Sequence, residues 1–138
     1  MSAEAFLDTN ILLYAISSAP AEQAKRTTAR ALLAAGDWGV SVQVLQEFYV
    51  NATRGPHPAM NHADATAVVE QFMQRPLVVT DPALMRTALM VKDRYQLAYW
   101  DAAIVAAAQQ LAATVLYSED LNAGQDYAGV TVVNPFRV

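Results

Sequence analysis

The sequence predicts an α/β fold with a mostly parallel central sheet. Short apolar runs of strand length alternate along the chain with longer segments whose apolar residues recur at helical spacing. Alternation of this kind builds strand–helix–strand units, which form a parallel sheet with right-handed crossovers and helices on its faces. Neither an internal repeat nor a linker interrupts the 138 residues, so we expect one domain spanning 1–138.

Capping residues divide the first half of the chain into elements. The first apolar run ends in Asp8, Thr9 and Asn10, which are residue types favoured at the start of a helix. Gly36 suits the left-handed conformation that ends a helix, and Ser41 suits the cap of the next one. The predicted order is a strand before Asp8, a helix over 11–16, a helix over 22–35, a strand over 38–40 and a helix from 42 to about 53.

A basic cluster occurs on the helix predicted over 22–35. Helical spacing turns an alanine-rich stripe inward and places Lys25, Arg26 and Arg30 on the other side. We therefore expect these three cations to form an ordinary solvated face.

Prolines and glycines divide the second half of the chain. Gly55, Pro56 and Pro58 exclude regular structure, so residues 54–58 form a loop. Asp81 precedes a proline at the first position of a helix, which assigns Asp81 to capping. The predicted order is a helix over 64–74, a strand over 77–79, a helix over 82–94, a buried helix over 99–108, a strand over 114–117 and a strand over 130–133.

Composition limits the classes of function. The chain has no cysteine, and no apolar run approaches the roughly 18 residues of a membrane span, so we expect a cytoplasmic protein without membrane association. The net charge of −4 argues against non-specific nucleic-acid binding through bulk charge, but not against a local basic groove. Because 54% of residues are hydrophobic and only 16% are charged, and because the loop around 54–61 is exposed, we expect a two-fold homodimer.

Four carboxylates are poorly explained by stability alone. Asp8 and Asp120 follow predicted strands, Glu47 lies at the apolar edge of a helix, and Asp101 opens a buried helix. Each has an ordinary explanation, because caps, solvated helix edges and favourable charges in a first helical turn use the same residue types. Carboxylates gathered in one place repel one another unless a cation joins them, so the set as a whole indicates a cation site.

The chemistry of these side chains selects the cation. Oxygen ligands without histidine or cysteine favour hard ions, and Mg²⁺ or Mn²⁺ bound through carboxylates and waters is common where phosphate oxygens complete the coordination shell. Such an ion lowers the pKa of a bound water and neutralises charge on a phosphoryl group during in-line displacement. The four acids therefore point to phosphodiester chemistry.

Four segments contain these acids and follow one another in the order Asp8-Thr9-Asn10, Gln46-Glu47-Phe48, the run from Trp100-Asp101 to Ala108, and Ser118-Glu119-Asp120. In this order they resemble the acidic signature of PIN-domain ribonucleases. More narrowly, the chain is similar to VapC-type toxins of bacterial toxin–antitoxin modules. The resemblance spans residues 8–120, nearly the whole chain, and is specific as an ordered set.

The resemblance implies a three-layer α/β/α PIN-like fold and endonucleolytic cleavage of RNA that depends on Mg²⁺ or Mn²⁺. It implies that Asp8 and Asp101 are metal ligands and that Glu47 is a ligand or a water-orienting base. The fourth acid is Asp120 or its neighbour Glu119, and the family spacing of Ser or Thr, one residue, then Asp favours Asp120. The resemblance also implies supporting roles for Asn10 and Ser118, and a cognate antitoxin as protein partner.

Two alternatives lack this nuclease activity. A receiver-type signalling domain also binds Mg²⁺ through acids, but it needs an adjacent pair of acids after its first strand and a lysine at the end of its last strand. Here the first strand is followed by Asp-Thr-Asn, and the only lysines, Lys25 and Lys92, fall on predicted helices. The second alternative is a PIN-like domain that only binds other proteins, which the four acids disfavour.

Overall fold

A computed structural model of the chain describes residues 1–137. Across these residues it contains six α-helices, one 3-10 helix and six strands. The predicted α/β class is confirmed. In chain order the elements are β1 (Ala5–Leu7), α1 (Thr9–Ile16), the 3-10 helix η1 (Pro20–Glu22), α2 (Gln23–Ala35), β2 (Trp38–Ser41), α3 (Val42–Ala52), α4 (His62–Phe72), β3 (Leu77–Val78), α5 (Pro82–Tyr95), α6 (Tyr99–Gln110), β4 (Val115–Tyr117), β5 (Asp126–Tyr127) and β6 (Val130–Val133).

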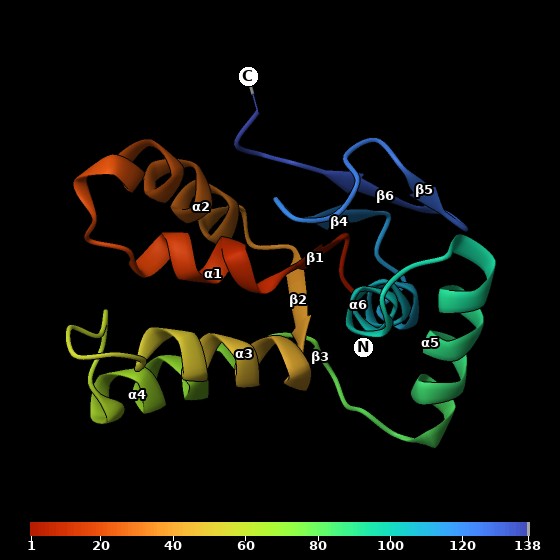
Figure 1. Ribbon diagram of the computed structural model, residues 1–138, viewed down its shortest axis with the longest axis horizontal. Coiled ribbons are helices and arrows are strands. Elements are labelled where there is room, and N and C mark those ends of the chain that lie inside the picture. The colour runs from red at the N-terminus through yellow and green to blue at the C-terminus, as the bar shows by residue number, and fades with distance from the viewer. Residues whose placement is uncertain (138) are drawn as a thin grey trace.

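The sheet is the middle of three layers (Figure 1). Its strand order is β3-β2-β1-β4-β6-β5, and every neighbouring pair is parallel except β5 with β6. Helices α1 to α4 cover one face, and α5 and α6 cover the other. The predicted three-layer arrangement with a mostly parallel sheet is therefore confirmed.

The predicted caps are present, and they set where the helices begin and end. The hydroxyl of Ser41 accepts a hydrogen bond from the Val44 amide at 3.2 Å, and the carboxylate of Asp81 accepts one from the Leu84 amide at 2.8 Å. Gly36 ends α2 with a φ of 93°, in the left-handed region. The capping role predicted for Asp81 leaves it outside the acidic site.

The basic cluster on α2 is less solvated than predicted, because Lys25 and Arg26 are half-buried and only Arg30 is exposed. Arg26 donates to the Ser17 carbonyl at 2.9 Å, and Arg30 donates through Nε to the Ala15 carbonyl at 2.8 Å. Both arginines therefore satisfy carbonyls at the C-terminal end of α1, which a helix leaves without internal partners. Lys25 donates to Glu119, which follows β4.

A second difference is a hairpin near the C-terminus. The segment between the strands predicted over 114–117 and 130–133 contains β5, which pairs antiparallel with β6. Ala128 and Gly129 connect the strands with φ values of 53° and 99°, the positive pair that a tight two-residue hairpin turn requires. Among residues 1–137, no helix is long and apolar enough to span a membrane.

Candidate functional site

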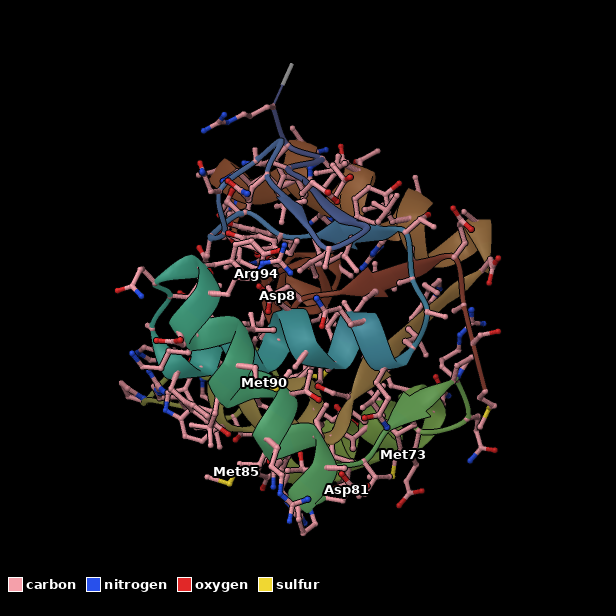
Figure 2. The ribbon with its side chains drawn as sticks, turned by 90° about the vertical axis from the view of Figure 1, so that its right-hand side faces the viewer. Asp8, Met73, Asp81, Met85, Met90 and Arg94 are labelled. Carbon is pink, nitrogen blue, oxygen red and sulfur yellow. The ribbon has the colours of Figure 1, made fainter. Side chains whose placement is uncertain are left out.

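Two of the four acids, Asp8 and Asp120, lie where neighbouring parallel strands end. In the register of β1 and β4, Leu7 lies opposite Tyr117, so the next residues, Asp8 and Ser118, emerge side by side. Figure 2 shows Asp8 near the middle of the molecule, where the chain leaves β1 above α6. Open α/β sheets bind ligands at this edge, outside the carboxyl ends of their strands.

Asp8 is the buried member of the group. Only 8% of its surface is exposed, and its carboxylate accepts hydrogen bonds from the Thr9 amide at 2.8 Å and from the Ser118 hydroxyl at 2.7 Å. Desolvation raises the pKa of Asp8 to about 6, although these hydrogen bonds act in the opposite direction. The charges of Glu47 and Asp120 also contribute to this raised pKa, so both acids lie within electrostatic reach of Asp8.

Asn10 and Ser118 hold the turn after β4 in place. The Asn10 amide donates to Asp120 at 3.1 Å, and its oxygen accepts a hydrogen bond from the Glu119 backbone at 3.2 Å. While donating to Asp8, the Ser118 hydroxyl accepts from the backbone of Asp120 at 3.1 Å. These bonds connect the end of β1 to the end of β4.

The adjacent acids Glu119 and Asp120 have different partners. Glu119 accepts from Tyr14 at 2.6 Å and pairs with Lys25 at 2.5 Å. Partial burial alone would raise the pKa of Glu119, but Lys25 and Tyr14 outweigh it and lower that pKa. The same ion pair raises the pKa of Lys25 to about 12. Glu119 is thus compensated by a cation, whereas Asp120 is exposed beside Asn10.

Glu47 and Asp101 complete the group from two helices. Glu47 is exposed on α3 and accepts a hydrogen bond from Gln43 at 2.9 Å, one turn earlier. Asp101 lies in the first turn of α6, where partial desolvation and the charge of Asp120 raise its pKa. Electrostatic coupling therefore joins Asp8 to Glu47 and Asp120, and Asp120 to Asp101.

The donor set suits a hard cation that keeps several of its waters. Among residues 1–137, no three Asp, Glu, His or Cys side chains come close enough together to form a ready-made metal-binding group. Mg²⁺ is commonly bound by only one or two carboxylates and contacts further acids through water, so an open arrangement of this kind is compatible with it. In the described residues, the hydroxyl of Thr9, next to Asp8, is buried without a hydrogen-bond partner. A buried polar atom of this kind usually needs a partner such as water or an ion.

Sequence reasoning missed the side chains that support these acids. Tyr14 and Lys25 fix Glu119, and Gln43 fixes Glu47. Two signals were available, because Tyr14 falls one helical turn after Asn10 and Gln43 falls one turn before Glu47. No local pattern connects Lys25 with Glu119, since they are 94 residues apart.

Comparison with known families identifies the fold family. The family model described as the PIN domain matches residues 5–125. The chain therefore belongs to the PIN domain family, as the ordered acidic segments indicated. Comparison with curated protein sequences gave no match.

Solved structures of toxin–antitoxin proteins share this fold. A toxin–antitoxin complex from Klebsiella pneumoniae has 22% identity and a TM-score of 0.70, with 97% of this chain and 99% of that chain covered. VapC20 from Mycobacterium tuberculosis, a sarcin-ricin loop cleaving toxin, has 21% identity and a TM-score of 0.64, with 84% and 89% covered. DNA-bound VapBC from Salmonella typhimurium has 18% identity and a TM-score of 0.65, with 94% and 96% covered.

The buried position of Asp8 predicts a pH dependence of stability in the absence of metal. The pKa of Asp8 is about 6 in the folded protein and about 4 in the unfolded chain, so the folded state binds the extra proton between these values. The free energy of unfolding in excess chelator should therefore fall as the pH rises through 6. The charged carboxylate should cost on the order of 2–3 kcal/mol at neutral pH.

Urea unfolding of the wild type and of Asp8→Asn at pH 5 and pH 8 measures this cost. The wild type should lose about 1–2 kcal/mol more than the variant between the two pH values, because asparagine does not titrate. Asp81→Asn serves as the control and should follow the wild type. Parallel behaviour of Asp8→Asn and the wild type would show that Asp8 is not a desolvated acid.

Proposed function

We propose that this protein is a Mg²⁺- or Mn²⁺-dependent endoribonuclease and the toxin of a type II toxin–antitoxin module. The observation that carries the proposal is a buried Asp8 at the end of β1 whose carboxylate is coupled to Glu47 and Asp120 in a PIN-domain fold. Carboxylates that lie close together without compensating cations destabilise the folded protein. Their presence at the end of the sheet is therefore better explained by a role in binding a cation.

Within this proposal the four acids have different roles. Asp8 and Asp101 are the direct metal ligands, because Asp8 is held rigidly by two hydrogen bonds and Asp101 opens a well-packed helix. Asp101, Glu47 and Asp120 are all exposed, whereas Asp8 is buried. Glu47 and Asp120 act through water or as additional ligands, with Glu47 orienting the attacking water. Asn10 and Ser118 keep Asp120 and Asp8 in position.

The bound ion would supply a water of lowered pKa and neutralise charge on the phosphoryl group. The protein contributes position, since its acids are mounted on the ends of β1 and β4 and on two helices. Burial keeps Asp8 poised near neutral pH, so ionisation and metal binding are linked. Metal affinity should therefore increase as the pH rises through 6.

The module and the substrate class rest on analogy with the similar structures. One of these is a toxin–antitoxin complex, and VapC20 is a sarcin-ricin loop cleaving toxin. The same acidic site offers an antitoxin a binding mode, because an arginine side chain matches carboxylates in charge and geometry and can take the place of the cation.

Cleavage assays with purified protein test the enzymatic proposal. RNA should be cleaved with Mg²⁺ or Mn²⁺ and not in excess EDTA. Asp8→Asn and Asp101→Asn should each lower the rate by about 100-fold or more, because loss of a ligand removes several kcal/mol of transition-state stabilisation. Asp81→Asn is the matched control, since Asp81 only caps α5 and asparagine is an equally good cap.

Two results would contradict the enzymatic proposal. One is cleavage that persists at the same rate in chelator. The other is wild-type rates in both acid variants, with circular dichroism showing that both are folded.

Inhibition by an antitoxin should compete with the metal. A peptide from the protein encoded beside this chain, carrying an arginine, should bind the wild type more weakly as Mn²⁺ is added. Asp8→Asn should weaken the complex by about tenfold, because a charged hydrogen bond is lost. Equal affinity for both proteins, unaffected by Mn²⁺, would exclude a guanidinium in the acidic site.

We further propose a homodimer, with Met85 and Leu89 of α5 at the contact surface. Met85 and Leu89 lie one turn apart on α5 and are about half exposed, at 50% and 48%. In Figure 2 the helix that carries them faces the viewer, and Met85 is labelled near its lower end. Exposed apolar stripes of this kind are common at contacts between identical chains.

Light scattering at high micromolar concentration tests this association. The wild type should have the mass of a dimer, and a double substitution of Met85 and Leu89 to glutamate should shift it toward the monomer. A monomeric wild type, or a double variant that stays dimeric, would contradict the proposed surface.

A further inference from the structure

Trp100 is exposed beside the candidate active site. Its side chain is 68% accessible, whereas the other tryptophan of the chain, Trp38, is only 5% accessible. It directly precedes Asp101 in the first turn of α6. Exposing so large an aromatic side chain to water is unfavourable. A single exposed apolar residue on a protein surface is common, but an exposed tryptophan next to an acidic site can contact a ligand that binds there.

The indole forms one wall of a hollow that reaches the acidic group. This hollow has a volume of about 380 Å³ and is lined by Gln43, Gln46 and Glu47 of α3 and by Trp100. A Tyr99 ring at 5.1 Å meets the indole edge-on, at an angle of 77°, and supports it from one side. The hollow thus presents a supported aromatic ring, two amide side chains and one proposed metal-site acid.

The side chains that line this hollow indicate which kind of molecule can bind in it. A planar, uncharged ring can stack on the indole, and amide groups can donate to and accept from the polar edge of such a ring. The same molecule must bring a phosphate toward Glu47 and Asp101, whose negative charges repel a phosphate unless a bound cation or added salt compensates them. A nucleobase joined to a phosphate by its ribose meets both demands, whereas an apolar peptide meets only the first.

We propose that Trp100 is a stacking platform for an unpaired nucleobase next to the scissile phosphate, with Gln43 and Gln46 at the edge of that base. This inference rests on the proposed ribonuclease function and defines its substrate as single-stranded or locally unpaired RNA. Because every base has an aromatic face, the platform binds bases with little sequence preference. The amides supply whatever preference there is.

Binding measurements without metal test the platform independently of catalysis. Fluorescein-labelled RNA hexamers of adenosine, cytidine or uridine are titrated with the full-length chain in excess EDTA and about 0.1 M salt, which screens the repulsion from the net charge. Trp100→Ala should weaken binding of at least one hexamer by about 5- to 100-fold. Trp100→Phe, which keeps an aromatic face, should recover most of the affinity.

Met90→Ala is the matched control for loss of an exposed apolar side chain. Met90 is also 68% exposed but lies on α5, outside the hollow (Figure 2). This variant should bind RNA like the wild type. Thermal unfolding should be unchanged in all three variants, because each altered side chain is largely in water.

Tryptophan fluorescence gives a second readout. A stacked base should quench the emission of the wild type, and Trp100→Phe should abolish the quenching, because the remaining Trp38 is buried. Quenching by an RNA that the protein fails to cleave even with Mn²⁺ would support the platform and remove the ribonuclease proposal. Cleavage with unchanged RNA affinity in Trp100→Ala would overturn the platform and leave the ribonuclease proposal in place.

Three further results would overturn the platform. One is the absence of binding and quenching with all three hexamers. Another is an equal loss of affinity in Met90→Ala. The third is conversion of a dimer to a monomer by Trp100→Ala, which would identify the indole as part of a protein contact.

Discussion

The hydrogen bond between Ser118 and Asp8 is the constraint on which the site depends. It crosses from the end of β4 to the end of β1 at 2.7 Å and exists because the register of these strands places the two residues side by side. Through it, a buried carboxylate is held in one orientation in spite of its desolvation. The Ser118 hydroxyl also accepts from the backbone of Asp120, so one side chain sets the positions of two acids.

The acids around this hydrogen bond fall into two groups, one with a cationic partner and one without. Glu119 is neutralised by Lys25 and hydrogen-bonded by Tyr14, so it anchors the turn after β4 to the helices α1 and α2. Asp8 and Asp101 have no such cation among residues 1–137, and desolvation, together with neighbouring negative charge, raises the pKa of each. Glu119 therefore stabilises the fold. Asp8 and Asp101 destabilise the metal-free protein, and a cation that binds to them would stabilise it.

Much of this arrangement could be predicted from sequence, because local chemistry determines it. Ser41, Asp81 and Gly36 specify helix ends through their own side chain or backbone, and the structure confirms all three. The ion pair of Lys25 with Glu119 could not be predicted, since no short-range pattern encodes a contact over 94 residues. The arginines of α2 were misplaced for a related reason, because their partners are carbonyls of another helix, which have no signature in the sequence.

Calorimetric titration of Mn²⁺ at pH 7.5 tests the central claim, that Asp120 and not Glu119 belongs to the cation site. Asp120→Asn should weaken Mn²⁺ binding by about 10- to 100-fold, the usual effect of losing a supporting group around a metal. Glu119→Gln keeps a partner for Tyr14 and should bind Mn²⁺ within about twofold of the wild type, because Glu119 is turned toward Lys25. A larger loss in Glu119→Gln than in Asp120→Asn would contradict the account.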